Sequence, residues 1–400
     1  MNNSDAQRRQ LLREELAGWA DVSPETVGLV RSPYRVCPLG AHVDHQMGQV
    51  TGLALDRALL LAFSPRDDEK ILLRSHQYDG TAETALDSPP GQPLGDWADY
   101  LRGAVVALKS EHELHRGMTA IVDGHGDVGG LSSSAAVGVA YLLALEAVNG
   151  LSLTPRQNIE LDRVLENDYI GLNNGILDQS SILLGRQDQL MHMDCRTGKA
   201  RLLPLGGRND ATVAVLFSGL RTPLTDSDYN RRVAECRQAA ALLLKAAGCP
   251  LPEQPVLRDV PEEAFREHAA DLPVPLRRRA QHFFGEQQRV ERGTDHWQEG
   301  RLEEFGRLMT ESGHSSVENY ECGNRYLRTA FDVLRTCQGV YGARFSGAGF
   351  RGCCIGLCDP EFDPRIRAEA LERYREEHPD MAAEAAVYFC RSADGAGLIE

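Results

Sequence analysis

The sequence predicts an α+β fold in two domains, and three observations support this prediction. The chain has 400 residues, which is the length of two domains of ordinary size. Strand-like and helix-like segments are both present, but they do not alternate in the regular order of a doubly wound sheet. A glycine-containing boundary near residue 206, "LGGRND", separates domains predicted over 1–205 and 206–400.

The first elements follow from their apolar patterns. The N-terminal stretch 1–20 lacks the apolar core of a signal peptide and is typical of an amphipathic surface helix. Two strands are predicted around the Pro/Asp turn of "ALLLAFSPRDDEKILLRS" (58–75), and "TAIVDG" (119–124) is a short apolar strand. The stretch 135–150 is apolar almost throughout, which predicts a buried helix that ends at Gly150.

The later elements are less regular. In order, the sequence predicts a helix over 155–171, a hairpin over 189–205, a strand over 211–220, mostly helices over 229–336, a glycine-rich turn leading into a strand within 342–357, a further helix, and a final strand at 385–390. This order is that of an α+β protein rather than of a βαβ protein.

The charge balance limits the kinds of partner. The formal net charge is −15 and the sequence pI is about 5.3, which argues against nucleic acid and anionic membranes. No apolar run reaches the roughly 18 residues that a membrane span needs. The ten cysteines show no metal-binding spacing and are typical of reduced thiols. We therefore expect a cytoplasmic protein that acts on small molecules.

A glycine–serine loop, "GGLSSSAA" (129–136), gives the strongest local signal. Glycines let the backbone approach a ligand closely, and the first amides of the following helix point outward with a partial positive charge. This arrangement suits a phosphate group. The alternative is a serine that caps a buried helix. The loop has neither the Walker pattern nor the Rossmann spacing.

Two acidic residues follow this loop. Glu166 lies on a helical segment, and Asp178 follows the glycine turn "NNGI". Carboxylates of this kind bind Mg²⁺ or take a proton from a hydroxyl group. The alternatives are a solvated helix face for Glu166 and a helix N-cap for Asp178.

Four motifs together resemble one family. "SPYRVCPLGAHVDHQMG" (32–48) resembles the galactokinase sugar-binding signature Gly-Arg-x-Asn-x-x-Gly-Glu-His-x-Asp-Tyr, and "GGLSSSAA" resembles the ATP-binding motif of the GHMP kinases. "GILDQ" (175–179) resembles the galactokinase segment with the catalytic aspartate, and "YGARFSGAGFRGC" (341–353) resembles the third family motif. The motifs stand in family order, and the chain looks most like the galacturonokinases.

The resemblance implies a fold and a reaction. The fold is the two-domain GHMP kinase fold, with a ribosomal-protein-like N-terminal domain and a ferredoxin-like C-terminal domain that carries inserted helices. The reaction is phosphoryl transfer from ATP to the anomeric hydroxyl of D-galacturonic acid, with Mg²⁺ as the metal ion. The expected partners are therefore a sugar acid and Mg-ATP.

The matched positions imply residue roles. Arg35 would stabilise developing negative charge, and Asp178 would accept or orient the hydroxyl proton. Glu166 would bind Mg²⁺ together with Ser134 or Ser133. The expected sugar-binding residues are Ala41, His42, Asp44, His45, Gly175 and Tyr229. The expected nucleotide-binding residues are Gly129, Gly130, Leu131, Ser132, Ser133, Ser134, Ala135 and Trp97, with a place in the core as the alternative for Trp97.

Two positions depart from the galactokinase signature, which has glutamate where this chain has Ala41 and tyrosine where it has His45. In galactokinases that glutamate lies near the carbon-6 hydroxyl of the sugar, where a uronic acid carries a carboxylate. Two carboxylates about 4 Å apart repel by about 4 kcal/mol at an effective dielectric constant of about 20, or about a thousandfold in affinity. Alanine removes this repulsion, and His45 is then expected to donate a hydrogen bond to the carboxylate, with Arg221 and Arg231 as further candidates.

Other functions stay open on the sequence alone. The loss of glutamate at position 41 is also compatible with a galactokinase or glucuronokinase that lacks one contact. A non-catalytic sugar sensor is the alternative of another class, but the intact Asp178 and serine loop argue against it.

Overall fold

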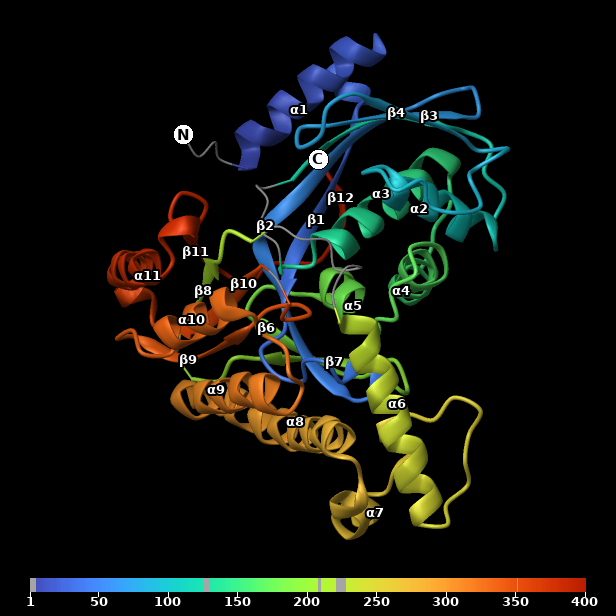
Figure 1. Cartoon of the computed structure of the whole chain (residues 1–400). Helices are drawn as coiled ribbons and strands as arrows, with labels where there is room; N and C mark the ends of the chain where they lie inside the picture. Colours follow the sequence, from blue (N-terminus) through green and yellow to red (C-terminus); the bar gives the residue numbers. More distant parts are fainter. Residues whose placement is uncertain (1–4, 125–129, 208–209, 221–227, 351) are drawn as a thin grey trace.

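The computed structural model describes residues 5–124, 130–207, 210–220, 228–350 and 352–400. The described strands form an eight-stranded sheet and a four-stranded sheet. Helices cover both sheets, and the two longest strands of the larger sheet run through the middle of the molecule (Figure 1). The two-domain α+β prediction is therefore confirmed.

The larger sheet comes mostly from the first half of the chain. Its strands are β1 (Gly28–Val36), β2 (Gln49–Pro65), β3 (Lys70–Ser75), β4 (Thr81–Ala85), β5 (Met118–Asp123), β6 (Gln189–Asp194), β7 (Lys199–Pro204) and β12 (Gly397–Ile399). Their order is β12-β1-β2-β5-β3-β4, and the hairpin of β6 and β7 pairs with the first residues of β2. The predicted strands around the Pro/Asp turn are β2 and β3, which lie on either side of β5 rather than next to each other.

The helices of this half are α1 (Asp5–Ala20), α2 (Asp99–Lys109), α3 (Ser133–Asn149), α4 (Pro155–Val164) and α5 (Leu177–Leu184). The predicted buried helix is α3, which is apolar on all sides because it packs against β1 and β2 as well as α2, α4 and α5. Gly150 ends it in the left-handed conformation, as predicted. The predicted helix over 155–171 is α4, followed by a π-helical turn (Leu165–Tyr169).

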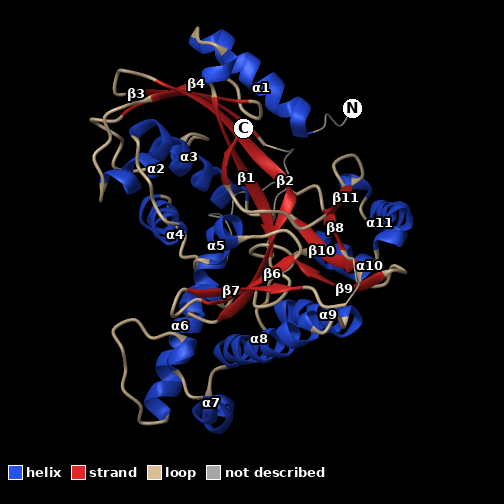
Figure 2. Ribbon diagram, turned by 180° about the vertical axis from the view of Figure 1, so that it is seen from behind, coloured by secondary structure: helices blue, strands red, loops and turns tan. Residues whose placement is uncertain are grey.

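The smaller sheet consists of β8 (Thr212–Phe217), β9 (Val340–Phe345), β10 (Cys353–Cys358) and β11 (Ala386–Cys390). The order β11-β8-β10-β9, with helices between β8 and β9 and between β10 and β11, is the β-α-β-β-α-β pattern of a ferredoxin-like domain. Its helices are α6 (Tyr229–Ala246), α7 (Glu262–His268), α8 (Val274–Gln298), α9 (Leu302–Glu318), α10 (Arg325–Leu334) and α11 (Asp363–Glu377). Figure 2 shows this domain beside the long strands of the larger sheet.

The prediction missed four of the described strands, namely β1, β4, β9 and β12. The glycine-rich turn is preceded by β9, so that β9 and β10 form a hairpin around it. The strand at 385–390 is not the final one, because β12 follows and pairs with β1. The last residues of the chain thus return to the larger sheet, while the boundary at 205/206 stays a prediction.

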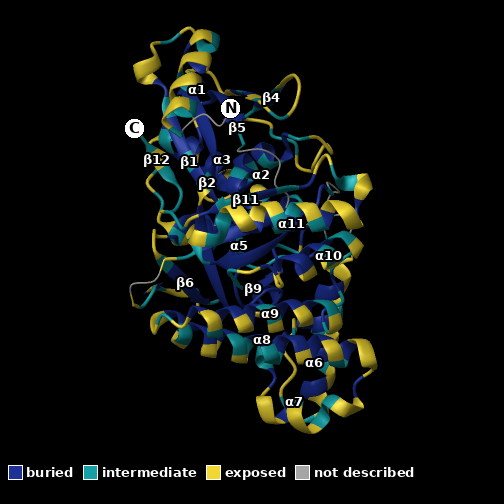
Figure 3. Cartoon of the chain, turned by 90° about the vertical axis from the view of Figure 1, so that its left-hand side faces the viewer, coloured by how far each residue is buried: buried dark blue, intermediate teal, exposed yellow. Residues whose placement is uncertain are grey.

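The buried and exposed faces of the helices are well separated. Helices α8 and α9 are exposed on one face and buried on the other in Figure 3, and α8 contacts both β2 and β7 of the larger sheet. In the part of the chain that the structure describes, no helix is both long enough and apolar enough to cross a membrane.

Candidate active site

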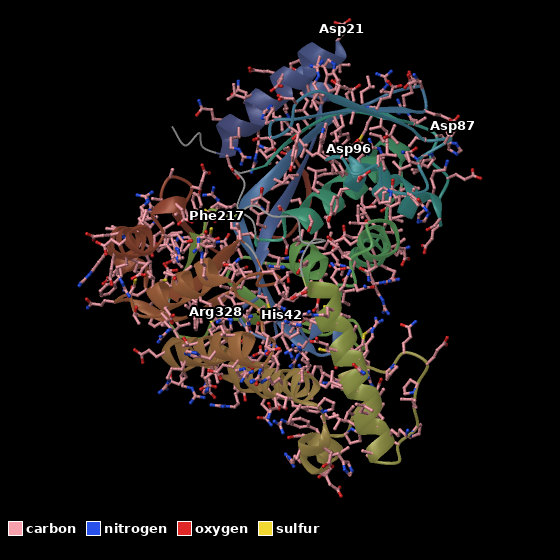
Figure 4. All side chains as sticks on the ribbon, in the orientation of Figure 1. Asp21, His42, Asp87, Asp96, Phe217 and Arg328 are labelled. Carbon is pink, nitrogen blue, oxygen red and sulfur yellow. The ribbon has the colours of Figure 1, made fainter. Side chains whose placement is uncertain are left out.

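A polar pocket lies where the two sheets approach each other, close to His42, which Figure 4 labels near the middle of the molecule. The space between the atoms that line the pocket is about 840 Å³, which includes open solvent. The predicted site residues that line it are Arg35, Ala41, His42, Asp44, Gly130, Ser132, Ser133, Ser134, Glu166, Asp178 and Tyr229. Residues far apart in the sequence therefore meet in one place.

Arg35 and Asp178 form an ion pair at the centre of the pocket. The Arg35 Nε and Nη2 atoms lie 2.7 and 2.6 Å from Asp178 Oδ1, and the Ser132 hydroxyl donates to Asp178 Oδ2. Arg35 is almost completely buried, and its Nη1 atom has no hydrogen-bond partner among the described residues. A buried donor of this kind is available to an incoming oxygen atom.

Glu166 is the second carboxylate of the pocket. Burial, followed by the charge of Asp178, raises the pKa of Glu166 to about 7, while hydrogen bonds from Asn174 and Ser134 lower it. The π-helical turn that carries Glu166 is a local irregularity of the kind that often occurs at functional sites. The site thus holds a carboxylate beside a serine hydroxyl.

The structure contradicts the structural alternatives for these residues. Glu166 is buried rather than on a solvated helix face. Asp178 lies in the first turn of α5, whose N-cap is Ile176. Ser132 occupies the N-cap position of α3, but its side chain makes no capping hydrogen bond and contacts Asp178 instead. Each side chain is therefore directed to the pocket.

The predicted sugar-binding loop, residues 38–48 and called the sugar loop below, forms one wall of the pocket with Ala41, His42 and Asp44. His42 has a φ of 61° although it is not glycine, a backbone conformation that costs about 1–3 kcal/mol and is enriched at functional sites. Its ring stacks on Tyr320, with the centroids 4.1 Å apart. Burial, and then the charge of Asp178, raise the pKa of Asp44 to about 6.

Gly175 is the predicted sugar-binding residue that packs against this loop. A Cβ atom at position 175 would lie 2.6 Å from both the carbonyl carbon and a carboxylate oxygen of Asp44. Any side chain would displace Asp44, which explains glycine at this position.

His45 does not line the pocket as described. Its Nε2 atom lies 3.1 Å from the Tyr320 hydroxyl, and its Nδ1 atom lies 2.9 Å from Gln46 Nε2. Burial lowers the pKa of His45 to about 3, so the ring is neutral at neutral pH. The geometry thus does not favour the predicted hydrogen bond from His45 to a substrate carboxylate, because both ring nitrogens already have protein partners.

The glycine–serine loop, which is the predicted phosphate-binding loop, leads into the N-terminus of α3. Gly130 has a φ of 95°, and a Cβ atom there would lie 3.0 Å from Cys353. The Ser346 hydroxyl donates to the Gly130 carbonyl at 2.6 Å, which ties the loop to the β9–β10 hairpin. Leu131 and Ala135 are fully buried and support the loop from behind. Gly129 lies outside the described residues.

Three further candidates lie elsewhere. Trp97 stacks on Tyr78 with centroids 5.7 Å apart and packs against the core, outside the described pocket lining. Its contact with a nucleotide stays a prediction. Arg231 is exposed and pairs with Asp228 at 2.8 Å, as a surface salt bridge does. Arg221 lies outside the described residues.

Six lining residues were not predicted from the sequence, namely Cys37, Leu172, Asn174, Leu177, Gly347 and Ala348. Most of them stand inside the motifs that were identified. Asn174 belongs to "NNGI", and Gly347 and Ala348 belong to the third glycine motif. For Asn174, its position directly before Gly175 of the motif could have indicated a place in the pocket.

The comparisons with known proteins agree with this geometry. Residues 99–186 match the family model for the N-terminal domain of GHMP kinases, and residues 296–376 match that for their C-terminal domain. The chain is 41% identical to a galacturonokinase of Arabidopsis thaliana, over 97% of both chains. It is 31% identical to a galactokinase of Roseiflexus sp. (strain RS-1), over 97% of this chain and 96% of the other.

A solved structure gives the same result. The crystal structure of Lactococcus lactis galactokinase in complex with galactose superposes with a TM-score of 0.88 at 28% identity, covering 97% of this chain and 98% of the other. The match therefore covers nearly the whole chain.

Proposed function

Since the chain belongs to the GHMP kinase family and is a sugar kinase, we propose that it phosphorylates the anomeric hydroxyl of D-galacturonic acid, with ATP as the donor. The products are galacturonate 1-phosphate and ADP. The similar galacturonokinase, at 41% identity over nearly the whole chain, supports this substrate.

The observation that carries the proposal is the position of Ala41. Its side chain lines the pocket beside His42, where the galactokinase signature has glutamate. A glutamate there would repel a substrate carboxylate about 4 Å away by about 4 kcal/mol at an effective dielectric constant of about 20. Alanine carries no charge and leaves room for the carboxylate.

Positive charge near His42 also supports an anionic sugar. Burial, followed by the neighbouring His282 and Arg344, lowers the pKa of His42 well below its usual value, and Arg35 acts in the same direction. Arg344 is fully buried on β9, and its Nη2 atom has no partner among the described residues. Arg35 and Arg344 thus place positive charge near His42, although each already faces a carboxylate, Asp178 and Glu286 respectively.

The mechanism that we propose depends on the ion pair of Arg35 and Asp178. Asp178 accepts or orients the proton of the anomeric hydroxyl, and its attachment to Arg35 and Ser132 fixes the carboxylate plane. The free Nη1 of Arg35 stabilises the negative charge that develops during transfer. His42, Asp44 and Tyr229 hold the sugar so that this hydroxyl faces the γ-phosphate.

Glu166 and Ser134 have the donor atoms that Mg²⁺ prefers. A carboxylate and a hydroxyl are hard oxygen ligands, and Mg²⁺ in kinases is bound by one or two carboxylates together with substrate phosphates. No group of three or more His, Cys, Asp or Glu side chains in the described ranges could hold a metal without a substrate. When bound, the ion would neutralise phosphate charge, while Asn174 keeps the Glu166 carboxylate in place.

The phosphate-binding groups that we propose are the backbone amides at the start of α3 and the hydroxyls of Ser133 and Ser134. Both hydroxyls belong to the pocket lining, and the partial positive charge of the helix N-terminus suits the phosphates of ATP. We further propose that the protein works in the cytoplasm, because all ten cysteines are free thiols.

The decisive experiment is a substrate panel. The protein is incubated with Mg-ATP and with galacturonate, glucuronate, galactose or glucose, and ADP release is measured. We expect the highest kcat/KM with galacturonate. Preference for galactose would overturn the charge argument and favour the activity of the Roseiflexus relative. Absence of turnover with every sugar would instead favour a sugar sensor.

A further inference from the structure

Helix α8 forms hydrogen bonds with the sugar loop near its start and just after its end. The Gly40 amide donates to Glu286 Oε2 at 2.9 Å, and the Ala41 carbonyl lies 3.0 Å from His282 Nε2. Just beyond the loop, the Gln49 amide donates to Gln287 Oε1 at 2.8 Å. His282 and Glu286 are four residues apart, so they project from the same face of α8.

The hydrogen bonds around His282 determine its tautomer. The Ala41 carbonyl can only accept, so His282 Nε2 carries the hydrogen atom. His282 Nδ1 then accepts from the Ser315 hydroxyl at 2.9 Å, and that hydroxyl in turn accepts from the Asn319 amide at 3.1 Å. Each donor in this series of hydrogen bonds has one acceptor. The series fixes the imidazole ring so that its Nε2–H group points at the Ala41 carbonyl of the sugar loop.

Glu286 is held just as firmly. It is fully buried, its Oε1 accepts from Arg289 Nε at 2.6 Å, and Arg344 lies 3.9 Å from its other oxygen. These contacts hold the Glu286 side chain in one rotamer. The oxygen that accepts from the Gly40 amide therefore has a fixed position. Helix α8 is thus a rigid partner for the two residues that precede His42.

The hydrogen bond from His282 is made to the peptide bond between Ala41 and His42, next to an unusual backbone conformation. The Ala41 carbonyl belongs to the peptide bond that leads into His42, whose backbone is in the left-handed region at φ 61°. A hydrogen bond to that carbonyl fixes the orientation of the peptide plane. It therefore helps to keep the left-handed conformation of His42 at a point where both Ala41 and His42 line the pocket.

We propose that His282 and Glu286 are positioning residues that set sugar affinity and sugar preference by fixing the Ala41–His42 peptide. Neither residue belongs to the described pocket lining, so both act through the loop. Both precede residue 296, where the match to the C-terminal family model begins. The inference rests on the proposed function, because it assumes that residue 41 faces carbon 6 of the sugar.

The first test compares His282→Ala with His282→Gln. Loss of the donor should raise KM for galacturonate about tenfold or more, leave KM for ATP within about twofold, and lower the ratio of galacturonate to galactose kcat/KM. Glutamine keeps an N–H group at the end of the side chain and should restore part of the affinity. His296→Ala, roughly four turns further along α8, is the matched control and should change neither KM.

Two results would overturn the inference. One is an unchanged sugar KM in His282→Ala, and the other is an equal rise in KM for sugar and ATP, which would indicate a general structural role. If His282→Ala does not fold, Ser315→Ala gives the same test, because it removes the donor to Nδ1 and leaves the imidazole in place. Its sugar KM should rise, and an unchanged KM would contradict the proposal.

Glu286→Gln provides an independent measurement. The amide oxygen can still accept from Gly40, but the charge that fixes the rotamer through Arg289 is lost, so we expect a weaker rise in sugar KM than in His282→Ala. A larger rise in ATP KM than in sugar KM would contradict the assignment. If the wild-type protein prefers another sugar, the proposed function fails, while the same KM comparison with that sugar still tests the grip of α8.

Discussion

Arg35 and Asp178 are 143 positions apart in the sequence, yet two nitrogen atoms of Arg35 lie within 2.7 Å of the same oxygen of Asp178. The pair joins the end of β1 to the first turn of α5. Since Ser132 contacts the other oxygen of Asp178, the carboxylate links the proposed sugar side of the pocket to the proposed phosphate side. Phosphoryl transfer needs this link, because the hydroxyl and the γ-phosphate must meet.

Replacement of Asp178 is predicted to stop transfer without preventing nucleotide binding. Asp178→Ala should lower kcat by about 10²–10⁴-fold, the usual contribution of a positioned acid or base. Nucleotide affinity, measured by calorimetry, should change little. Asp168→Ala is the matched control, because Asp168 is an exposed acid on the π-helical turn beside the pocket. Equal losses in both variants would contradict the assigned role.

Introduction of a carboxylate at position 41 is predicted to discriminate between sugars. Ala41→Glu should lower kcat/KM for galacturonate by up to about a thousandfold, which corresponds to the roughly 4 kcal/mol of repulsion estimated for two close carboxylates. The loss with galactose should be much smaller. Ala41→Gln has nearly the same size without the charge, so equal losses in the two variants would mean that volume rather than charge decides.

The sequence predicted the parts of the site that depend on short motifs. The glycine–serine loop and "GILDQ" are local patterns, and their side chains do meet in one pocket. It did not predict the partners of His45, because one of them, Tyr320, lies 275 positions away. Both ring nitrogens of His45 have protein partners, Tyr320 and Gln46, and no local sequence pattern indicates this.

The hydrogen bonds from α8 to the sugar loop could not be predicted from the sequence either. His282 and Glu286 look like ordinary polar residues of a helix, and only the packing of α8 against the sugar loop gives them partners. Strand β12 has three residues, and its pairing with β1 depends on the path of the chain end rather than on an apolar pattern. Tertiary contacts rather than local preference decide such elements.

The pH dependence of sugar use is predicted to follow Asp44. Burial, and next the charge of Asp178, raise the pKa of Asp44 to about 6. In the proposed role, the carboxylate form of Asp44 accepts hydrogen bonds from sugar hydroxyls, and the protonated form would accept fewer. As pH falls from 7 to 5, kcat/KM for the sugar should therefore decrease, by about tenfold per pH unit once the pH is below the pKa. Asp44→Asn should have low activity and a weaker pH dependence, because Glu166, whose burial raises its pKa to about 7, still titrates in this range. An identical profile in the variant would rule out Asp44.

The two serines are predicted to differ in their effect on magnesium use. Ser134 donates to Glu166 and helps to lower the pKa of that carboxyl, whereas Ser133 is exposed at the start of α3. Ser134→Ala should raise the Mg²⁺ concentration for half-maximal rate by about 10–100-fold. Ser133→Ala is the matched control and should change it little. The opposite order would transfer the metal site to Ser133.

Protonated His76 is predicted to stabilise the fold up to mildly alkaline pH. His76 lies 2.9 Å from Glu15 on α1 and 3.2 Å from Asp123 at the end of β5, and Arg8 of α1 also pairs with Asp123 at 2.8 Å. The hydrogen bond with Asp123 raises the pKa of His76 to about 9, with Glu15 acting in the same direction. Because the pKa is raised in the folded state, the stabilisation is complete below the unfolded pKa of about 6.5. The stabilisation declines as pH rises and is lost above about 9.

Thermal unfolding of the wild type and of His76→Gln should therefore differ in Tm at pH 6 and converge near pH 9.5. High salt should narrow the difference, because the ring is partly exposed. A difference in Tm that stays constant from pH 6 to 9.5 would show that His76 acts through packing rather than through its charge.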